Sequence, residues 1–114
     1  MQKSSVNKVI LVGHLGAKPE SRYTQQGIST ASFSLATNEF WTGAGNKKQE
    51  HTEWHQIITW NKLADYVKEY LDKGHHIYLE GSIRTRLWSD KKGNTKKIVE
   101  IFATHIVSLE KTNM

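Results

Sequence analysis

The stretch TEWHQIITWNKLADYVKEYLDKG, residues 52–74, changes its hydrophobic period at Asn61. Before that position, β-branched and aromatic side chains are typical of a strand. After it, apolar residues recur at i, i+4, i+7 and i+8, which indicates an amphipathic helix: Leu63, Val67, Tyr70 and Leu71. Asn61 is suited to cap the start of this helix, and Gly74 to follow its end. We therefore expect a strand followed at once by a helix.

Further strand patterns lie on both sides of this stretch. Two precede it, at residues 9–12 and 28–38, and two follow it, at residues 75–88 and 96–109. Polar, glycine-containing segments at 42–51 and 89–95 indicate hairpin loops between long strands. Five strands with one helix between the third and the fourth predict an all-β fold, the five-stranded Greek-key barrel known as the OB-fold.

Composition limits the class of protein. The 114 residues suffice for one domain, which we expect to span residues 1–114, and they include no cysteine, which excludes disulfides and cysteine nucleophiles. No segment approaches the ~20 apolar residues of a membrane span. The short apolar run near the N-terminus indicates a strand and not a signal peptide, so we expect a cytoplasmic protein. The net charge of +5 favours an anionic partner such as nucleic acid.

Four tryptophans are many for a domain of this size. Trp54 and Trp60 share one face of their strand, but both faces hold apolar residues, so the pattern does not tell which face is inside. Trp41 and Trp88 adjoin lysine-bearing loops, where exposure is expected. Exposed indoles can stack unpaired bases, each worth ~1–3 kcal/mol. The alternative is a structural protein in which all four are buried.

Basic side chains accompany these aromatic residues. Arg84, Arg86 and Trp88 alternate on one face of the strand at residues 75–88, and the other face is mostly apolar and expected to join the core. A basic track would bind the phosphates of single-stranded nucleic acid and make binding sensitive to salt. The candidate phosphate contacts are Lys8, Arg22, Lys48, Lys62, Lys73, Arg84, Arg86 and Lys92.

Other chemistry finds little support in the sequence. Six histidines suggest a metal site, but on a loop and a strand the spacing of His51 and His55 does not bring the two rings together. The glycine-rich segments lack the following helix that a nucleotide-binding motif requires. No nucleophile stands in a recognisable arrangement with a base. We expect no enzyme, no metal and no cofactor.

Several segments together resemble bacterial single-stranded DNA-binding protein (SSB): VNKVILVGHLG, Arg22-Tyr23, SLATNEFW, residues 52–74, IYLEGSIRTRLWSDKKGN and the closing strand. The resemblance covers about residues 6–109. It implies non-catalytic, sequence-independent binding and protection of single-stranded DNA during replication, recombination and repair. It also implies a homotetramer in the bacterial cytoplasm, associated with the nucleoid.

The resemblance assigns roles to individual residues. It implies that bases stack on Trp41, Trp54, Trp60 and Trp88. At the position of Trp60, a phenylalanine is usual in the family. Family basic positions match Arg22, Lys62, Lys73, Arg84 and Arg86. A family histidine at the subunit interface matches His55. Family members usually continue into a disordered segment with an acidic tip that recruits replication and repair proteins. Here the chain ends at LEKTNM, so this recruitment is not expected.

Three further hypotheses about the function remain open at this stage. One is the related primosomal accessory protein, which the four tryptophans and the Arg84, Arg86, Trp88 row disfavour. Another is RNA binding by a similar barrel, because bases of RNA stack in the same way. A small nuclease is the third, and it would need a cluster of carboxylates or histidines.

Overall fold

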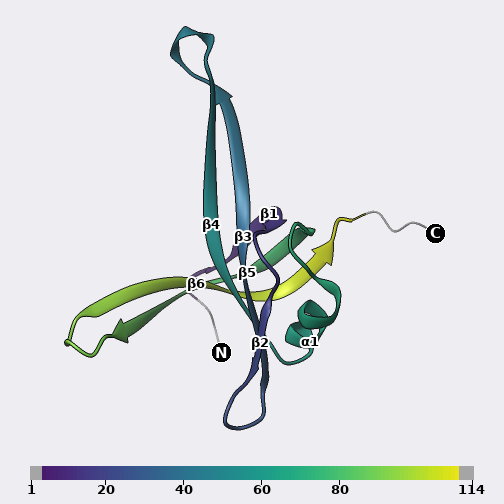
Figure 1. Cartoon of the computed structure of the whole chain (residues 1–114), viewed down its shortest axis with the longest axis vertical. Helices are drawn as coiled ribbons and strands as arrows, with labels where there is room; N and C mark the ends of the chain where they lie inside the picture. Colours follow the sequence, from purple (N-terminus) through teal and green to yellow (C-terminus); the bar gives the residue numbers. More distant parts are fainter. Residues whose placement is uncertain (1–3, 111–114) are drawn as a thin grey trace.

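Within residues 4–110, which the computed structural model describes, the chain forms six strands and one α-helix (Figure 1). The strands are β1 (Val9–Leu15), β2 (Glu20–Tyr23), β3 (Ser29–Thr42), β4 (Lys48–Trp60), β5 (His76–Ser89) and β6 (Thr95–Ser108). The helix α1 (Asn61–Tyr70) follows β4 directly, and a short 3₁₀ turn, η1 (Ala44–Asn46), joins β3 to β4. The two ends of the predicted domain, residues 1–3 and 111–114, lie outside the described residues.

Five of the strands close into a barrel. The order is β1–β5–β6–β4–β3, and β3 returns to β1 where Leu15 pairs with Leu35. All these pairs are antiparallel except β4 with β6. At the closure, β1 passes so near to β3 that a side chain on Gly13 would overlap the carbonyl oxygen of Ala36. This topology confirms the predicted Greek-key barrel with its helix between the third and fourth barrel strands.

A sixth strand, β2, was not predicted. It pairs with β3 and extends the sheet beyond the barrel, with Glu20 opposite Ser32 and Arg22 opposite Thr30. All four of its residues are exposed. The segment ESRY therefore has no alternation of apolar and polar residues, which is the signal that indicates a strand in a sequence.

The helix covers one end of the barrel and completes the core. Ala64 and Val67 are fully buried against barrel residues such as Leu35, Ile57 and Leu79.

The predicted ends of the helix were wrong. Asn61 is already inside it and provides no side-chain cap, and Gly74 lies in a later turn, where its amide donates to the Leu15 carbonyl. No helix within residues 4–110 is long and apolar enough to cross a membrane.

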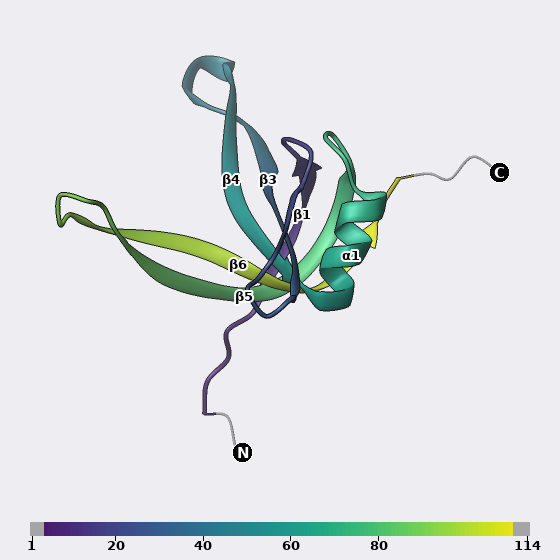
Figure 2. The ribbon, with the colours of Figure 1, turned by 60° about the horizontal axis from the view of Figure 1, so that its bottom comes forward.

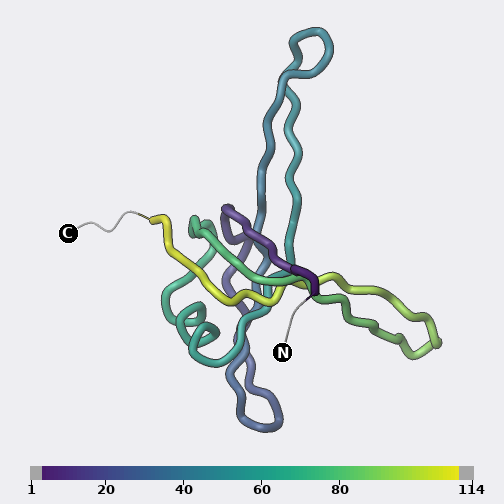
Figure 3. Tube along the Cα trace, turned by 180° about the vertical axis from the view of Figure 1, so that it is seen from behind, coloured from purple at the N-terminus to yellow at the C-terminus, as the bar shows by residue number. Residues whose placement is uncertain are grey.

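Two hairpins extend beyond the barrel as arms, one formed by β3 and β4 and the other by β5 and β6 (Figures 1 and 2). Figure 3 shows that helix α1 and the last residues of β6 lie on the side of the barrel away from the β5–β6 arm. The predicted core face of β5 is correct only for its first half. Ile77 and Leu79 are fully buried, whereas Ile83 and Leu87 are 48% and 66% exposed, because this half of the strand lies in the arm.

Candidate nucleic-acid interface

The two tryptophans of β4 lie on the outside of the barrel. Trp54 is 59% exposed and Trp60 is 37% exposed, while Ile57 and Thr59 on the other face are fully buried. The buried Thr59 hydroxyl donates to the Ala31 carbonyl at 2.8 Å, so the polar atom of the inner face has a partner. The structure thus assigns the two faces that the alternation could not distinguish.

Trp54 rests on the backbone of the turn after β1. A methyl group on Gly16 would overlap the six-membered ring of Trp54, so the indole lies directly against that glycine. The Gly16 amide donates to the Ser34 carbonyl at 3.0 Å, which ties this turn to β3. Glycine at this position allows the indole to lie against the turn and leaves more than half of the side chain exposed.

The other two tryptophans stand on the arms. Trp41 is 50% exposed on β3, beside Phe40 and Lys48 on the same hairpin. Trp88 is 45% exposed on β5, and the Nζ atom of its cross-strand partner Lys96 lies 6.0 Å from the centre of its ring. Each arm therefore combines an exposed indole with a lysine, which is the pairing that stacked bases and adjacent phosphates require.

The basic residues predicted as phosphate contacts fall into two groups. Three have carboxylate partners: Lys8 Nζ lies 3.1 Å from Glu80, Arg22 lies 3.9 Å from Glu20, and Arg86 Nε lies 3.2 Å from Glu100. Among residues 4–110, no ion pair engages the other five, which are Lys48, Lys62, Lys73, Arg84 and Lys92. Only this second group has its positive charge available without a competing carboxylate.

These ion pairs also affect ionisation. The pKa of Glu80 is lowered, first by the hydrogen bond that the Tyr78 hydroxyl donates to it at 2.6 Å and then by the bond from Lys8. The pKa of Arg86 is raised by its hydrogen bonds to Glu100. These hydrogen bonds therefore favour the charged forms of Glu80 and Arg86.

His55 lies on the face of β4 opposite Trp54 and Trp60 and is partly buried. Its Nε2 atom is hydrogen bonded to the Thr37 hydroxyl at 2.9 Å. His51, four residues earlier, is bonded to Glu53 instead. No group of three or more potential metal ligands occurs in the described part of the chain.

The model of the single-strand binding protein family matches residues 6–109. The chain belongs to the single-strand binding protein family. The resemblance seen in the sequence is therefore confirmed, and the match covers the barrel and both arms.

Relatives named single-stranded DNA-binding protein 1 support this membership. That of Chlorobaculum tepidum is 48% identical over 102 residues, 90% of this chain and 60% of the relative. That of Xylella fastidiosa is 44% identical over 110 residues, 95% of this chain and 80% of the relative. The chain thus spans only part of the length of these family members.

Solved structures of the family share the fold. A Plasmodium falciparum SSB in complex with ssDNA is 34% identical, with a TM-score of 0.87, covering 96% of this chain and all of that one. A deletion mutant of the Thermus aquaticus single-stranded DNA binding protein is 30% identical, with a TM-score of 0.79, covering 92% of this chain and 51% of that one.

Reasoning from the sequence missed two aromatic residues of this surface. Phe40 is 72% exposed next to Trp41, and Phe102 on β6 lies beside Trp60, with ring centres 5.9 Å apart. Phe40 could have been noticed from its position next to Trp41. The proximity of Phe102 to Trp60 depends on the parallel pairing of β4 with β6, of which the local sequence gives no sign.

Proposed function

We propose that this chain binds single-stranded DNA without sequence preference and protects it without catalysing a reaction. The observation that supports this most directly is the exposure of all four tryptophans, between 37% and 59%, on the barrel surface and on both arms. Bases of a single strand would stack on Trp41, Trp54, Trp60 and Trp88. Family membership and the ssDNA-bound structural neighbour agree with this function.

The phosphates would follow the basic residues that have no carboxylate partner among residues 4–110: Lys48, Lys62, Lys73, Arg84 and Lys92. Lys8, Arg22 and Arg86 were also expected in this track, but a phosphate would have to compete there with a carboxylate. We propose that these three contribute less to phosphate binding. The role in the cell would be that of the family, in replication, recombination and repair in the bacterial cytoplasm and at the nucleoid.

We also propose that the chain assembles as a homotetramer. One supporting observation is an apolar row across the outer face of β1, β5 and β6, where Val12 pairs with Tyr78 and Tyr78 with Val107. Val12 and Val107 are about half exposed, and Ile10 beside them is 56% exposed. A contiguous exposed apolar surface of this kind favours contact with another protein surface. His55, on the face of β4 opposite Trp54 and Trp60, would contribute to a subunit interface.

The experiment that tests the binding proposal is a titration of intrinsic tryptophan fluorescence with oligo(dT), repeated at several salt concentrations. We expect strong quenching by the single strand and none by duplex DNA, because only unpaired bases offer their faces for stacking. Oligo(rU) in a parallel titration separates DNA binding from RNA binding. Binding without quenching would contradict stacking, and no binding at low salt would contradict the function.

A further inference from the structure

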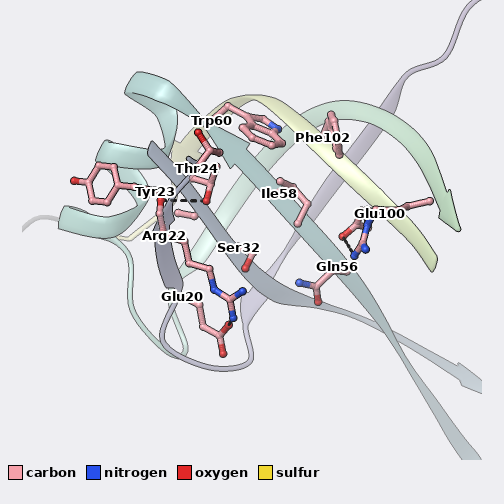
Figure 4. A pocket seen from close by; sticks show the side chains of 13 residues that line it. Glu20, Arg22, Tyr23, Thr24, Ser32, Gln56, Ile58, Trp60, Glu100 and Phe102 are labelled. Carbon is pink, nitrogen blue, oxygen red and sulfur yellow. Dashed lines mark hydrogen bonds and ion pairs between the residues drawn. The ribbon is translucent and has the colours of Figure 1, made fainter. Parts of the chain in front are cut away.

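A groove of about 520 Å³ runs across the sheet on the face that carries Trp60 (Figure 4). The strand register places one residue from each of four strands in a row along its floor. Glu20 of β2 is opposite Ser32 of β3, Ser32 is opposite Ile58 of β4, and Ile58 is opposite Phe102 of β6. The floor of the groove is therefore formed by the sheet itself.

One end of the groove is aromatic. The rings of Trp60 and Phe102 have centres 5.9 Å apart and are tilted by 60° (Figure 4). Ile58, two residues before Trp60 on β4, pairs with Phe102 and also lines this end. A flat base stacked on one of these rings would meet the edge of the other, an arrangement that aromatic groups favour. The Arg84 guanidinium lies over the Phe102 ring, 5.4 Å from its centre, so a cation stands at the border of this apolar end.

The rest of the groove is polar but balanced in charge. The charged residues in its lining are two arginines and two glutamates, and each arginine is beside a glutamate. Arg86 donates from Nε and Nη2 to the two carboxylate oxygens of Glu100 at 3.2 and 3.4 Å, and Glu100 is only 6% exposed. Arg22 is 3.9 Å from Glu20. The charges of the lining thus sum to zero.

This balance indicates what the groove would bind. A phosphate diester is an anion, and a lining of zero net charge offers it no net attraction. A nucleobase is neutral and flat, and it has hydrogen-bonding groups at its edge. The aromatic end suits its faces, and the polar lining, which includes Gln56 and Ser32, suits its edge.

We propose that this groove is a slot for one unpaired base of single-stranded DNA, in which Phe102 contacts the base together with Trp60. The pairing of Arg86 with Glu100 keeps the Arg86 charge out of the phosphate track, which passes at Arg84. This inference rests on the proposed function. It adds Phe102 as a residue that contacts a base, and it removes Arg86 from the residues that bind phosphate.

The first test uses Phe102→Leu, which keeps an apolar side chain on β6 but removes the aromatic ring. We expect its affinity for oligo(dT) to fall about five- to tenfold, the lower range for loss of one stacked base, with an unchanged salt dependence. Phe102→Tyr, which keeps a ring, should bind as the wild type does. Tyr70→Leu removes an exposed ring from α1, outside the groove, and should have no effect.

An abasic oligomer, with the same phosphodiester chain but no bases, distinguishes base from phosphate contact. Wild type and Phe102→Leu should bind it equally. If Phe102→Leu lost as much affinity for the abasic oligomer as for oligo(dT), the base slot would be overturned. Wild-type affinity of Phe102→Leu for oligo(dT), with Trp54→Ala still weakened, would overturn the slot and leave the proposed function standing. Failure of the wild type to bind any single strand would overturn the function itself.

The second test measures how the logarithm of the affinity changes with the logarithm of the salt concentration. Arg86→Gln should leave this slope unchanged, because its charge is already neutralised. Glu100→Gln should make the slope steeper by about 0.7, the value for one additional phosphate contact on a single strand. A flatter slope for Arg86→Gln would show that Arg86 already binds phosphate and would overturn this part. Arg86→Gln decides the matter if Glu100→Gln does not fold.

Discussion

The indole of Trp54 lies against the backbone of Gly16, with no room for even a methyl group between them. Trp54 is nevertheless 59% exposed, so the glycine supports one side of the ring and leaves the other side open. The φ angle of Gly16 is not positive. Glycine is therefore needed here for space and not for an unusual backbone conformation.

Gly16→Ala should therefore weaken binding to single-stranded DNA by displacing Trp54, while the barrel stays folded. We expect a loss of affinity smaller than that of Trp54→Ala, with little change in the melting temperature. Oligo(dT) titrations of both single variants and of the double variant form the measurement. In the Trp54→Ala background, Gly16→Ala should have almost no further effect, because the ring that it displaces is gone. Additive losses would contradict this coupling.

The β5–β6 arm offers a comparison between two neighbouring residues on opposite faces. Trp88→Ala should lower the affinity for oligo(dT) by about fivefold or more, because one exposed stacking surface is lost. Leu87→Ala, which truncates a still more exposed side chain on the other face, should leave the affinity unchanged. Circular dichroism should show both variants folded. An unfolded Trp88→Ala protein would refute the surface role of this tryptophan.

Much of this architecture could be predicted from the sequence because it depends on local pattern. The change of period at Asn61 predicted the helix, and alternating residues predicted the barrel strands. Exposure of Trp41 and Trp88 was expected from the lysine-bearing loops beside them. For Trp54 and Trp60 the pattern gave no answer, because β4 has apolar residues on both faces.

What could not be predicted depends on contacts between distant parts of the chain. Ile83 and Leu87 have the alternation of core residues, but the pairing of β5 with β6 shifts at Glu80 and Gly81, and both strands then continue past the barrel. Local alternation does not reveal where the core ends. In the same way, Phe102 meets Trp60 only because β6 lies parallel to β4.

The tip of the β5–β6 arm should respond to acid. The pKa of Asp90 is lowered, chiefly by the backbone amide of Asn94, which donates to its carboxylate at 2.9 Å, with a further bond from the Lys92 amide at 2.8 Å. A lowered pKa means that the folded tip favours the charged carboxylate. Its contribution to stability is present at neutral pH and is lost as the pH falls through that lowered pKa.

Amide chemical shifts followed by NMR from neutral to acidic pH test this prediction. The signals of Lys92 and Asn94 should move together as Asp90 is protonated, while the barrel signals stay in place. Asp90→Asn retains an acceptor oxygen but does not titrate, so the transition should vanish in that variant. A transition that persists in Asp90→Asn would assign it to another group.

The salt dependence of binding should distinguish the paired from the unpaired lysines. Lys48 stands beside Trp41 on the β3–β4 arm, whereas the Lys8 ammonium is 3.1 Å from the Glu80 carboxylate. We expect Lys48→Gln to flatten the slope of affinity against salt by about 0.7, and Lys8→Gln to leave it unchanged. Titrations at four or more salt concentrations give both slopes. Equal slopes for the two variants would contradict the grouping by ion pairs.

Substitution of His55 should disturb assembly before it disturbs contact with DNA. Its ring is partly buried on the face of β4 away from the two indoles, where it bonds to Thr37. We expect His55→Ala to dissociate into smaller species on dilution, at concentrations where the wild type stays assembled, as measured by sedimentation velocity. At high protein concentration its tryptophan quenching by oligo(dT) should match that of the wild type.

The control is His51→Asn. His51 is an exposed histidine on the same strand, bonded to Glu53, so the assembly of this variant should not differ from that of the wild type. If His55→Ala sediments as the wild type does throughout the dilution series, the interface role of this residue is wrong.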